Sequence, residues 1–436
     1  MHIRCNARML IIIGAACWLC AAPLQAQQAA ITIDLKNALE RARLNSPQFQ
    51  SSSLAVEAAR IDRYLAKTAF LPTANYINEY VYTQGNGTPS GVFVGNDGVH
   101  VYNSQAIVHQ EIYAPARMAE YRRSIAAEAV AGAKKDVVLR GVVSTVFQNY
   151  YAVALAQRHL ANSLKSLEET RQFLDISQKL EQGGEAAHSD VIKAQLTLDQ
   201  RDRDAQEARF SVEKSKISLA VLMFPDAIPE FAIVDDLDNI IPLAPFSQVE
   251  SSARETNPDL RAAQQSLREE QYGVAIARSG YYPSFSFDYF FGINNNEFAA
   301  HDQEGHNRLG SVAQATLNIP VFNWWTTKSK VRQAELKRQQ AQLDVSLTLR
   351  ELNASLRASY LEGQTALAQL DLLRHTLDLA RESLRLTTIR YEAGEVTVLE
   401  VVDAQSTLAQ ARNSCDEGLA RYRLVLANIQ TLTGNY

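Results

Sequence analysis

The chain has 436 residues, enough for two or three ordinary domains, yet it contains only 19 Gly and 12 Pro. These residues gather at a few places, and the long uninterrupted stretches between them predict long helices. The formal net charge of −5 excludes the strongly basic surface of most nucleic-acid-binding proteins. Walker A, HExxH and GxSxG motifs are absent and the histidines lack metal-ligand spacing, so we expect no enzyme, cofactor or metal site.

Residues 1–26 are predicted to be a secretory signal peptide. Arg4 and Arg8 precede an apolar run that is short for a membrane-spanning helix. We predict cleavage after Ala26. Lipidation of Cys17 is the alternative, although the residues before it lack the branched apolar side chain that begins a lipobox. No later run of 18 apolar residues occurs, so any membrane crossing must consist of β-strands.

The rest of the chain is predicted to consist of two internal repeats, repeat 1 at 27–224 and repeat 2 at 247–436. Between them, residues 225–246 contain four prolines and are predicted to be an extended linker that forms a small belt around the helices. Matching residues of the two repeats lie 210 or 211 positions apart: Pro47 with Pro258, Pro72 with Pro283, Gly184 with Gly394, Glu185 with Glu395, Val191 with Val401 and Leu198 with Leu408.

Each repeat is predicted to open with a helix that a proline interrupts, at 34–69 and at 248–279. Alternating apolar and polar residues then predict two β-strands per repeat. The four strands are expected at 73–83, 100–112, 284–293 and 309–321.

The strands have the composition of membrane-spanning β-structure. Eight of the 18 residues from 281 to 298 are aromatic, which favours a face in contact with lipid. Strands of about ten residues suit a tilted bilayer crossing. Trp324 and Trp325 follow the last strand directly, where they suit the aromatic girdle at a membrane interface.

Long helices are predicted at 116–180 and 326–391, each about 100 Å in length. Leucine and valine recur every seven residues along both, which is typical of coiled coils. Gly183, Gly184 and Gly394 are expected to form the turns into shorter returning helices. Because these helices, at 188–223 and 398–432, have half the length of their partners, the opening helices are expected to stack end to end with them.

Four strands per chain are too few to close a barrel, and open strand edges cannot face lipid. Several chains must therefore share one barrel. Two chains would supply eight strands and a barrel filled by side chains, whereas three would supply twelve strands with room for a conduit. The sequence by itself leaves both possibilities open.

The order of helix, strand pair, long helix, glycine turn and short helix resembles the TolC family of outer-membrane efflux proteins. Tyr391-x-x-Gly394 and the run from Val401 to Leu408 carry the resemblance, and Glu181 departs from it where a tyrosine would align. The resemblance covers the mature chain. It implies a homotrimer in the outer membrane, with a twelve-stranded β-barrel and an α-helical periplasmic tube of twelve helices. Such a channel is the passive exit duct of a tripartite efflux or type I secretion system, docked by a periplasmic adaptor and an inner-membrane transporter.

Glu400 and Asp403 are the candidate pore-constriction residues. They lie three apart at the start of a helix, so both project from one face. The resemblance implies that, tripled by symmetry, such acidic residues form rings that select cations at the closed periplasmic mouth. For Glu400 the alternative is a capping box with Thr397, whereas no capping role explains Asp403.

Asp190 and Tyr391 are the candidate latch at the tip. Tyr391 is expected to donate its hydroxyl to Asp190 and hold the two helical tips together, as the resemblance implies for the closed mouth. The alternative is that Asp190 caps its own helix. The rival function is a periplasmic coiled-coil adaptor, which would have a single hairpin flanked by small β-domains.

Overall fold

The computed structural model describes residues 31–83, 99–225 and 230–435. The expected signal peptide with Ala26 and Cys17 lies outside the described residues, as does the loop 84–98. The elements of the first half are β1 (Ile31–Ile33), α1 (Leu35–Asn45), α2 (Pro47–Thr68), β2 (Thr73–Thr83), β3 (Val99–Tyr113), α3 (Pro115–Gln182) and α4 (His188–Met223).

The second half repeats this order, with helices of near-equal length. Its elements are β4 (Phe231–Ile233), α5 (Phe246–Thr256), α6 (Pro258–Ser279), β5 (Ser284–Asn295), β6 (Gly310–Asn318), α7 (Thr326–Glu392) and α8 (Val398–Thr433). The long helices α3 and α7 have 68 and 67 residues, and α4 and α8 have 36 each. The predicted mainly α fold with four longer strands and two long helical hairpins is confirmed.

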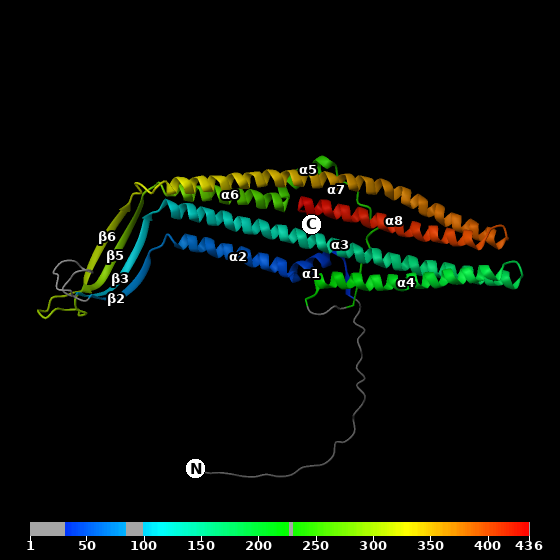
Figure 1. Ribbon diagram of the computed structural model, residues 1–436, viewed down its shortest axis with the longest axis horizontal. Coiled ribbons are helices and arrows are strands. Elements are labelled where there is room, and N and C mark those ends of the chain that lie inside the picture. The colour runs from blue at the N-terminus through cyan, green and yellow to red at the C-terminus, as the bar shows by residue number, and fades with distance from the viewer. Residues whose placement is uncertain (1–30, 84–98, 226–229, 436) are drawn as a thin grey trace, which may run out of the picture.

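The molecule is an elongated slab with the four-stranded sheet at one end and the turns of both helical hairpins at the other (Figure 1). Next to the sheet, α3 packs between α2 and α6, and α6 packs on α7. In the other half, α3 packs between α4 and α8, and α8 packs on α7. The shorter helices therefore stack end to end beside the long ones, as the sequence predicted.

Side chains at the proline interruptions fasten these stacked ends. Pro47 and Pro258 each occupy the first position of a helix, where the missing N–H costs nothing. Just before Pro47, Asn45 donates from Nδ2 to the Met223 carbonyl at 2.5 Å, at the end of α4. In the second half Asn257 donates to the Leu432 carbonyl at 2.9 Å, near the end of α8. Each proline thus begins a helix, and an asparagine just before it donates to one of the last carbonyls of another helix.

The sheet has the strand order β2-β3-β5-β6, with all neighbours antiparallel. The central pair β3–β5 joins the two halves of the chain. The outer strands β2 and β6 each have one neighbour, and every residue of β6 is exposed. The strand order matches the helix order α2-α3-α6-α7 next to the sheet, so each edge of the sheet continues into one edge of the helical layer.

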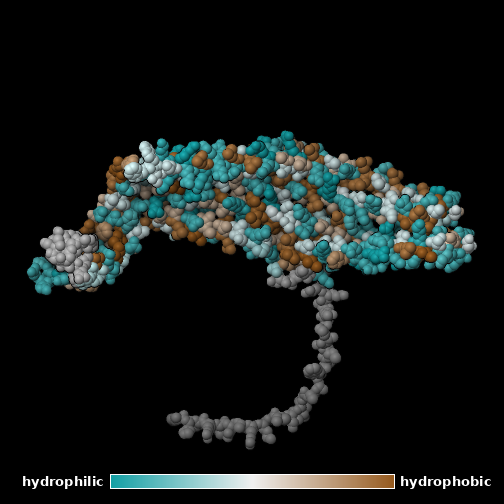
Figure 2. Space-filling model, viewed as in Figure 1, coloured by the Kyte–Doolittle hydropathy of each residue, from teal (hydrophilic) through white to brown (hydrophobic). Residues whose placement is uncertain are grey.

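The register gives the two faces of the sheet different compositions. One face, here called the aromatic face, carries residues that pair across the strands as Tyr80–Tyr102, Val108–Tyr289 and Phe285–Leu317. The opposite face, here called the polar face, pairs Glu79 with Asn103, His109 with Asp288, Asp288 with Gln314, and Ser286 with Thr316. Figure 2 shows hydrophobic surface along the strands next to the helices.

The last strand ends earlier than the sequence predicted, at Asn318 rather than at 321. Pro320 explains the difference, because proline has no N–H for the ladder and restricts the residue before it. The chain then turns through Trp324 and Trp325, which both have positive φ (53° and 64°). This backbone is strained for bulky residues. The other strands agree with their predicted positions to within two residues.

None of the helices among the described residues combines the length and the apolar composition that a membrane span requires. The largest buried cluster instead lies in the middle of the molecule, where α1, α3, α4, α7, α8 and the β1–β4 pair meet. Tyr150 and Tyr422 are its largest buried side chains. A second cluster lies at the helical tip, around Phe173, Tyr391 and Val401.

Candidate functional site

The tip consists of the two turns that join α3 to α4 and α7 to α8. Gly184 and Gly394 have φ of +75° and +73°, a conformation that glycine adopts without strain. Gly183 has an ordinary helical φ of −73° and is the C-cap of α3. The turn geometry therefore requires glycine at Gly184 and Gly394, while Gly183 only ends the helix.

Glu400 and Asp403 lie in the first turns of α8, and both side chains are exposed. The Glu400 carboxylate accepts a hydrogen bond from the Thr397 backbone N–H at 3.3 Å. The capping role weighed for Glu400 is thus present in the structure. Asp403 makes no hydrogen bond or ion pair within the described residues, so its charge faces solvent in the single chain.

Tyr391 is 5% exposed and packs against Phe173, with ring centroids 5.1 Å apart. Its hydroxyl donates to Ser177 Oγ at 3.3 Å, not to the expected Asp190. The packing explains this choice, because the ring lies in an apolar cluster between α3 and α7 where Ser177 is the nearby acceptor. Asp190 is half-buried in the first turn of α4. A latch between Tyr391 and Asp190 is thus not formed within the single chain.

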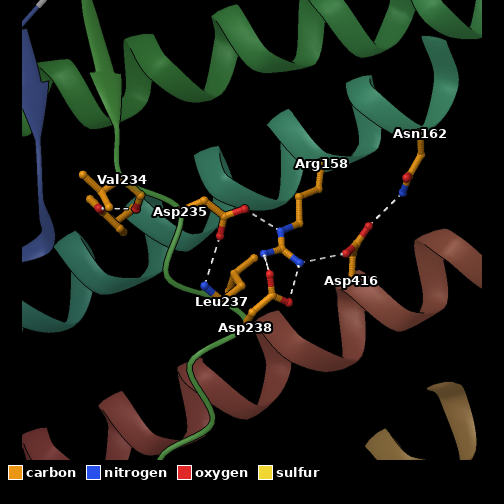
Figure 3. A network of polar contacts seen from close by, with 8 residues as sticks. Arg158, Asn162, Val234, Asp235, Leu237, Asp238 and Asp416 are labelled. Carbon is orange, nitrogen blue, oxygen red and sulfur yellow. Dashed lines mark hydrogen bonds and ion pairs between the residues drawn. The ribbon is translucent and has the colours of Figure 1, made fainter. Parts of the chain in front are cut away.

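A polar network, here called the waist network, ties the linker to α3 and α8 (Figure 3). Arg158 of α3 donates to Asp235 at 2.5 Å, to both oxygens of Asp238 at 3.1 and 2.7 Å, and to Asp416 of α8 at 3.1 Å. Asn162 donates to the other oxygen of Asp416 at 2.8 Å. One guanidinium thus joins both halves of the chain through their linker.

The charges of the waist network stabilise one another. Burial alone would lower the pKa of Arg158, but its hydrogen bonds to Asp238, Asp235 and Asp416 raise that pKa above its usual value. The hydrogen bond from Arg158 also holds the pKa of Asp238 below its usual range. The arginine is therefore always charged, and Asp238 stays a carboxylate at neutral pH.

Further contacts hold the linker in place around this network. The linker residue Asp236 pairs with Arg423 of α8. Tyr422 donates its hydroxyl to the Ile241 carbonyl at 2.6 Å, and Tyr150 donates to the Val234 carbonyl at 2.7 Å. Burial raises the pKa of Tyr150 to about 12, so it stays a donor. The linker is thus a strap with bonds to α3 and α8 along its length.

On the polar face of the sheet, a histidine and an aspartate contact each other across two strands. His109 Nδ1 of β3 lies 2.6 Å from Asp288 Oδ1 of β5. Both groups come from the strands that join the two halves of the chain. Polar side chains that pair with one another on this face indicate that it contacts water or other polar groups.

Trp324 and Trp325 are exposed, Trp324 to 84%. They form the turn between β6 and α7, at the helical end of the sheet. The Trp324 ring contacts Phe322, and Lys328 lies 5.2 Å from the centre of the Trp325 ring. The position at this boundary agrees with the place expected for them, while contact with lipid stays a prediction.

One cluster of possible metal ligands occurs among the described residues, although the sequence spacing indicated none. Asp302, Glu304 and His306 bring one ligand atom each within 4.8 Å of one another in the loop between β5 and β6. The Asp302 carboxylate already accepts from the backbone N–H groups of Glu304 and His306 at 3.0 and 2.7 Å. This turn accounts for the arrangement.

Comparison with known proteins assigns the fold and the family. The family model described as "Outer membrane efflux protein" matches residues 38–223 and 249–435. The chain belongs to the outer membrane efflux protein family. Its two matched segments coincide with the two halves of the fold, and they leave out the linker that carries Asp235 and Asp238.

Individual members of the outer membrane efflux protein family match most of the chain. The alkaline protease secretion protein AprF of Pseudomonas aeruginosa is 21% identical, covering 93% of this chain and 85% of AprF. The outer membrane protein TolC of Vibrio cholerae is 24% identical, covering 91% of this chain and 89% of TolC. A crystal structure of a membrane protein from Pseudomonas aeruginosa shares the fold, with a TM-score of 0.79 at 18% identity over 93% of this chain and 91% of that one.

Membership in this family confirms the resemblance to TolC that the sequence indicated. It also confirms the outer membrane as the location and a channel rather than an enzyme as the function. The rival interpretation as a periplasmic adaptor is not supported, because the chain has two hairpins and a four-stranded sheet at their common end.

Sequence reasoning missed the waist network and the His109–Asp288 pair. The run Val234-Asp-Asp-Leu-Asp238 places three acids in a short apolar linker, and that signal could have indicated a buried cation partner. Nothing local singles out Arg158, which is one of many charged residues on a long helix. The charge pair on the sheet depends on the register between distant strands, which the sequence does not show.

Replacing Arg158 by methionine is expected to destabilise the protein by about 2 kcal/mol, because three carboxylates then lose the guanidinium to which all of them bond. The free energy of unfolding from a denaturant titration measures this. Arg171→Met is the matched control, since its pair with Glu168 is solvent-exposed, and its effect should stay below about 0.5 kcal/mol.

The same substitution should alter the dependence of stability on pH. The lowered pKa of Asp238 stabilises the wild type fully above the unfolded carboxyl pKa of about 4, and this contribution is lost as the pH falls through the folded value. The difference between wild type and Arg158→Met should therefore shrink below about pH 4. A difference that stays constant through that range would contradict the assigned role of Arg158.

Proposed function

We propose that the chain assembles as a homotrimer whose strands complete a twelve-stranded barrel in the outer membrane and whose helices complete a periplasmic tube. This channel is the passive exit duct of a tripartite efflux or type I secretion system. A periplasmic adaptor and an inner-membrane transporter dock on it and supply the energy. The observation that carries the proposal is that the slab has two different open edges and one polar face.

The two edges consist of different elements, and both expose apolar side chains. One edge consists of β2, α2 and α4, and exposes Leu54, Ile61 and Leu196. The other consists of β6 and α7, and exposes Leu343, Leu372 and Leu379. Contact between unlike edges is heterologous, and such contacts form a closed ring of identical subunits when the rotation from one subunit to the next closes. Joining β6 of one subunit to β2 of the next also removes the unpaired strand edges.

The polar face supports three subunits rather than two. A barrel of eight strands is filled by its own side chains and leaves no open conduit. The face of this sheet that lies opposite the aromatic residues carries Glu79, Gln105, Asp288 and Gln314 beside the apolar Ile107, Phe290 and Val312. Such a lining suits the water-filled lumen of twelve strands, with the aromatic face turned to lipid.

The tip of the proposed tube carries the pore constriction. In a trimer, Glu400 and Asp403 would form two stacked carboxylate rings at the periplasmic mouth. In this arrangement the Glu400 carboxylate keeps its capping bond to the Thr397 N–H at the start of α8. Asp190 and Tyr391 are proposed to latch the closed mouth across neighbouring tips, which requires Tyr391 to give up its bond to Ser177.

The assembly is tested by electrophoresis of the outer-membrane fraction with and without boiling, followed by planar-bilayer recording. We expect a trimer in the unboiled sample, a monomer after boiling, and a steady ion-conducting pore from the trimer. A protein that migrates as a dimer, or a trimer that conducts no ions, would contradict the proposed channel.

A further inference from the structure

A cavity of about 610 Å³ lies where the sheet meets the helices. It is formed by the base of β3, the first turns of α3 and the last turns of α6. Its lining is mainly apolar and aromatic, with Ile112, Tyr113, Met118, Tyr272, Ala275 and Tyr282. The volume falls within the range of roughly 300–1,000 Å³ that is common for small-molecule sites.

The cavity borders both faces of the sheet at the base of β3, because its lining includes Glu111, which pairs with Ser286 of the polar face, and Tyr113 of the aromatic face. A β-bulge after Glu111 shifts the register so that Tyr113 pairs with Phe285, which belongs to that face. Gln110 lies on the same side, opposite Phe287, and donates to the Phe70 carbonyl at 3.0 Å. Phe70 itself lines the cavity. Through Tyr113, the cavity borders the surface that the proposed channel presents to lipid.

The cavity has an excess of positive charge. Arg117 and Arg122 both line it, and Glu111 is the carboxylate among the lining residues. Arg117 donates to Glu111 at 3.0 Å, so these two charges compensate each other. Arg122 is exposed and makes no ion pair or hydrogen bond within the described residues. An apolar cavity beside one uncompensated guanidinium suits an amphiphile with an anionic head.

We propose that this cavity binds one anionic glycerophospholipid of the surrounding bilayer leaflet, with its phosphate at Arg122 and an acyl chain among Met118, Tyr272 and Ala275. The site rests on the proposed function, because only a membrane-embedded sheet places the cavity at the height of lipid headgroups. Trp324 and Trp325, at the same helical end of the sheet, mark that height. The site lies within one subunit, between α3 and α6, with Phe70 on the side of the edge formed by α2 and β2.

The test uses the full-length trimer, stripped of lipid in detergent and titrated with phosphatidylglycerol or phosphatidylcholine, with bound lipid counted by native mass spectrometry. Arg122→Gln should weaken phosphatidylglycerol binding about fivefold and phosphatidylcholine binding less, because the choline cation already compensates the phosphate of phosphatidylcholine. Ala275→Phe, which fills the cavity, should weaken binding of both lipids.

Arg123→Gln is the matched control. Arg123 lines a different cavity with α6 and α7 and pairs with Glu269 at 3.3 Å, so its loss should leave both lipids unaffected. Equal binding of both lipids by the wild type, or equal binding by wild type, Arg122→Gln and Ala275→Phe, overturns the site. In those cases the unboiled trimer and its conductance still report on the proposed channel, and their loss in the wild type would overturn that proposal separately.

Discussion

Replacing Gly292 by alanine is expected to prevent the sheet from forming its central strand pair. An added Cβ would lie 2.2 Å from the Ser104 carbonyl oxygen and 2.7 Å from the Gln105 Cα, and both are backbone atoms of β3 that cannot rotate away. The two strands must separate, at a cost of about 3 kcal/mol or more. Because β3–β5 is the pair that joins the two halves, we expect little heat-sensitive trimer in the outer-membrane fraction.

Gly310 provides the control, because it pairs with Gly292 across β5 and β6. A Cβ on Gly310 would meet no atom within 4 Å. Gly310→Ala should therefore give wild-type amounts of trimer, as judged by the same unboiled gel. Equal trimer yields from the two alanine variants would show that the close approach of β3 and β5 at Gly292 does not govern assembly.

The contrast between these two glycines shows that sequence patterns reveal the strands but not the register between distant strands. Both were visible in strands with alternating residues, but only the register between β3 and β5 distinguishes them. That pairing links residues about 190 apart, as for Gln105 and Gly292, and the alternation within each strand does not specify it. Helix positions were predictable to within a few residues, because heptads and prolines act locally.

Among the candidate sites, too, the features set by local sequence were predictable and those set by contacts between distant segments were not. The turns at Gly184 and Gly394 were evident from a glycine between two helical patterns, and Thr397-x-x-Glu400 predicted the capping bond that the structure contains. The partner of Tyr391 was not predictable, because burial between α3 and α7 selects Ser177. The waist network was missed for a related reason, since Arg158 acquires its role only from the linker that crosses it.

The waist network and the tip are connected through the same two helices. Arg158 and Glu169 of α3 face Asp416 and Arg412 of α8, so ion pairs follow the α3–α8 contact from the linker toward the tip. The Arg412 side chain is 7% exposed and bonds both oxygens of Glu169. Movement of α8 against α3 would break these pairs. The position of α8 at the tip therefore depends on ion pairs that lie between the tip and the linker.

Replacing both Glu400 and Asp403 by alanine is expected to raise single-channel conductance and to reduce cation over anion preference about tenfold. Six carboxylates would leave the mouth of a trimer, and rings of one sign concentrate counter-ions by about that factor or more. The smaller side chains would also widen the mouth. Conductance and reversal potentials in planar bilayers under a salt gradient measure both effects.

Isosteric substitutions separate the charge of these residues from their size and from the cap. Glu400→Gln keeps an oxygen for the Thr397 N–H, and Asp403→Asn keeps the side-chain volume. This double variant should lose cation preference while its conductance stays near that of the wild type. Asp202→Asn, an exposed site higher on α4, should change neither. A ring that selects ions by its charge must lose its selectivity when that charge is removed. If the isosteric variant kept its cation preference, Glu400 would be a helix-capping residue and Asp403 a solvated one, and neither would form the constriction.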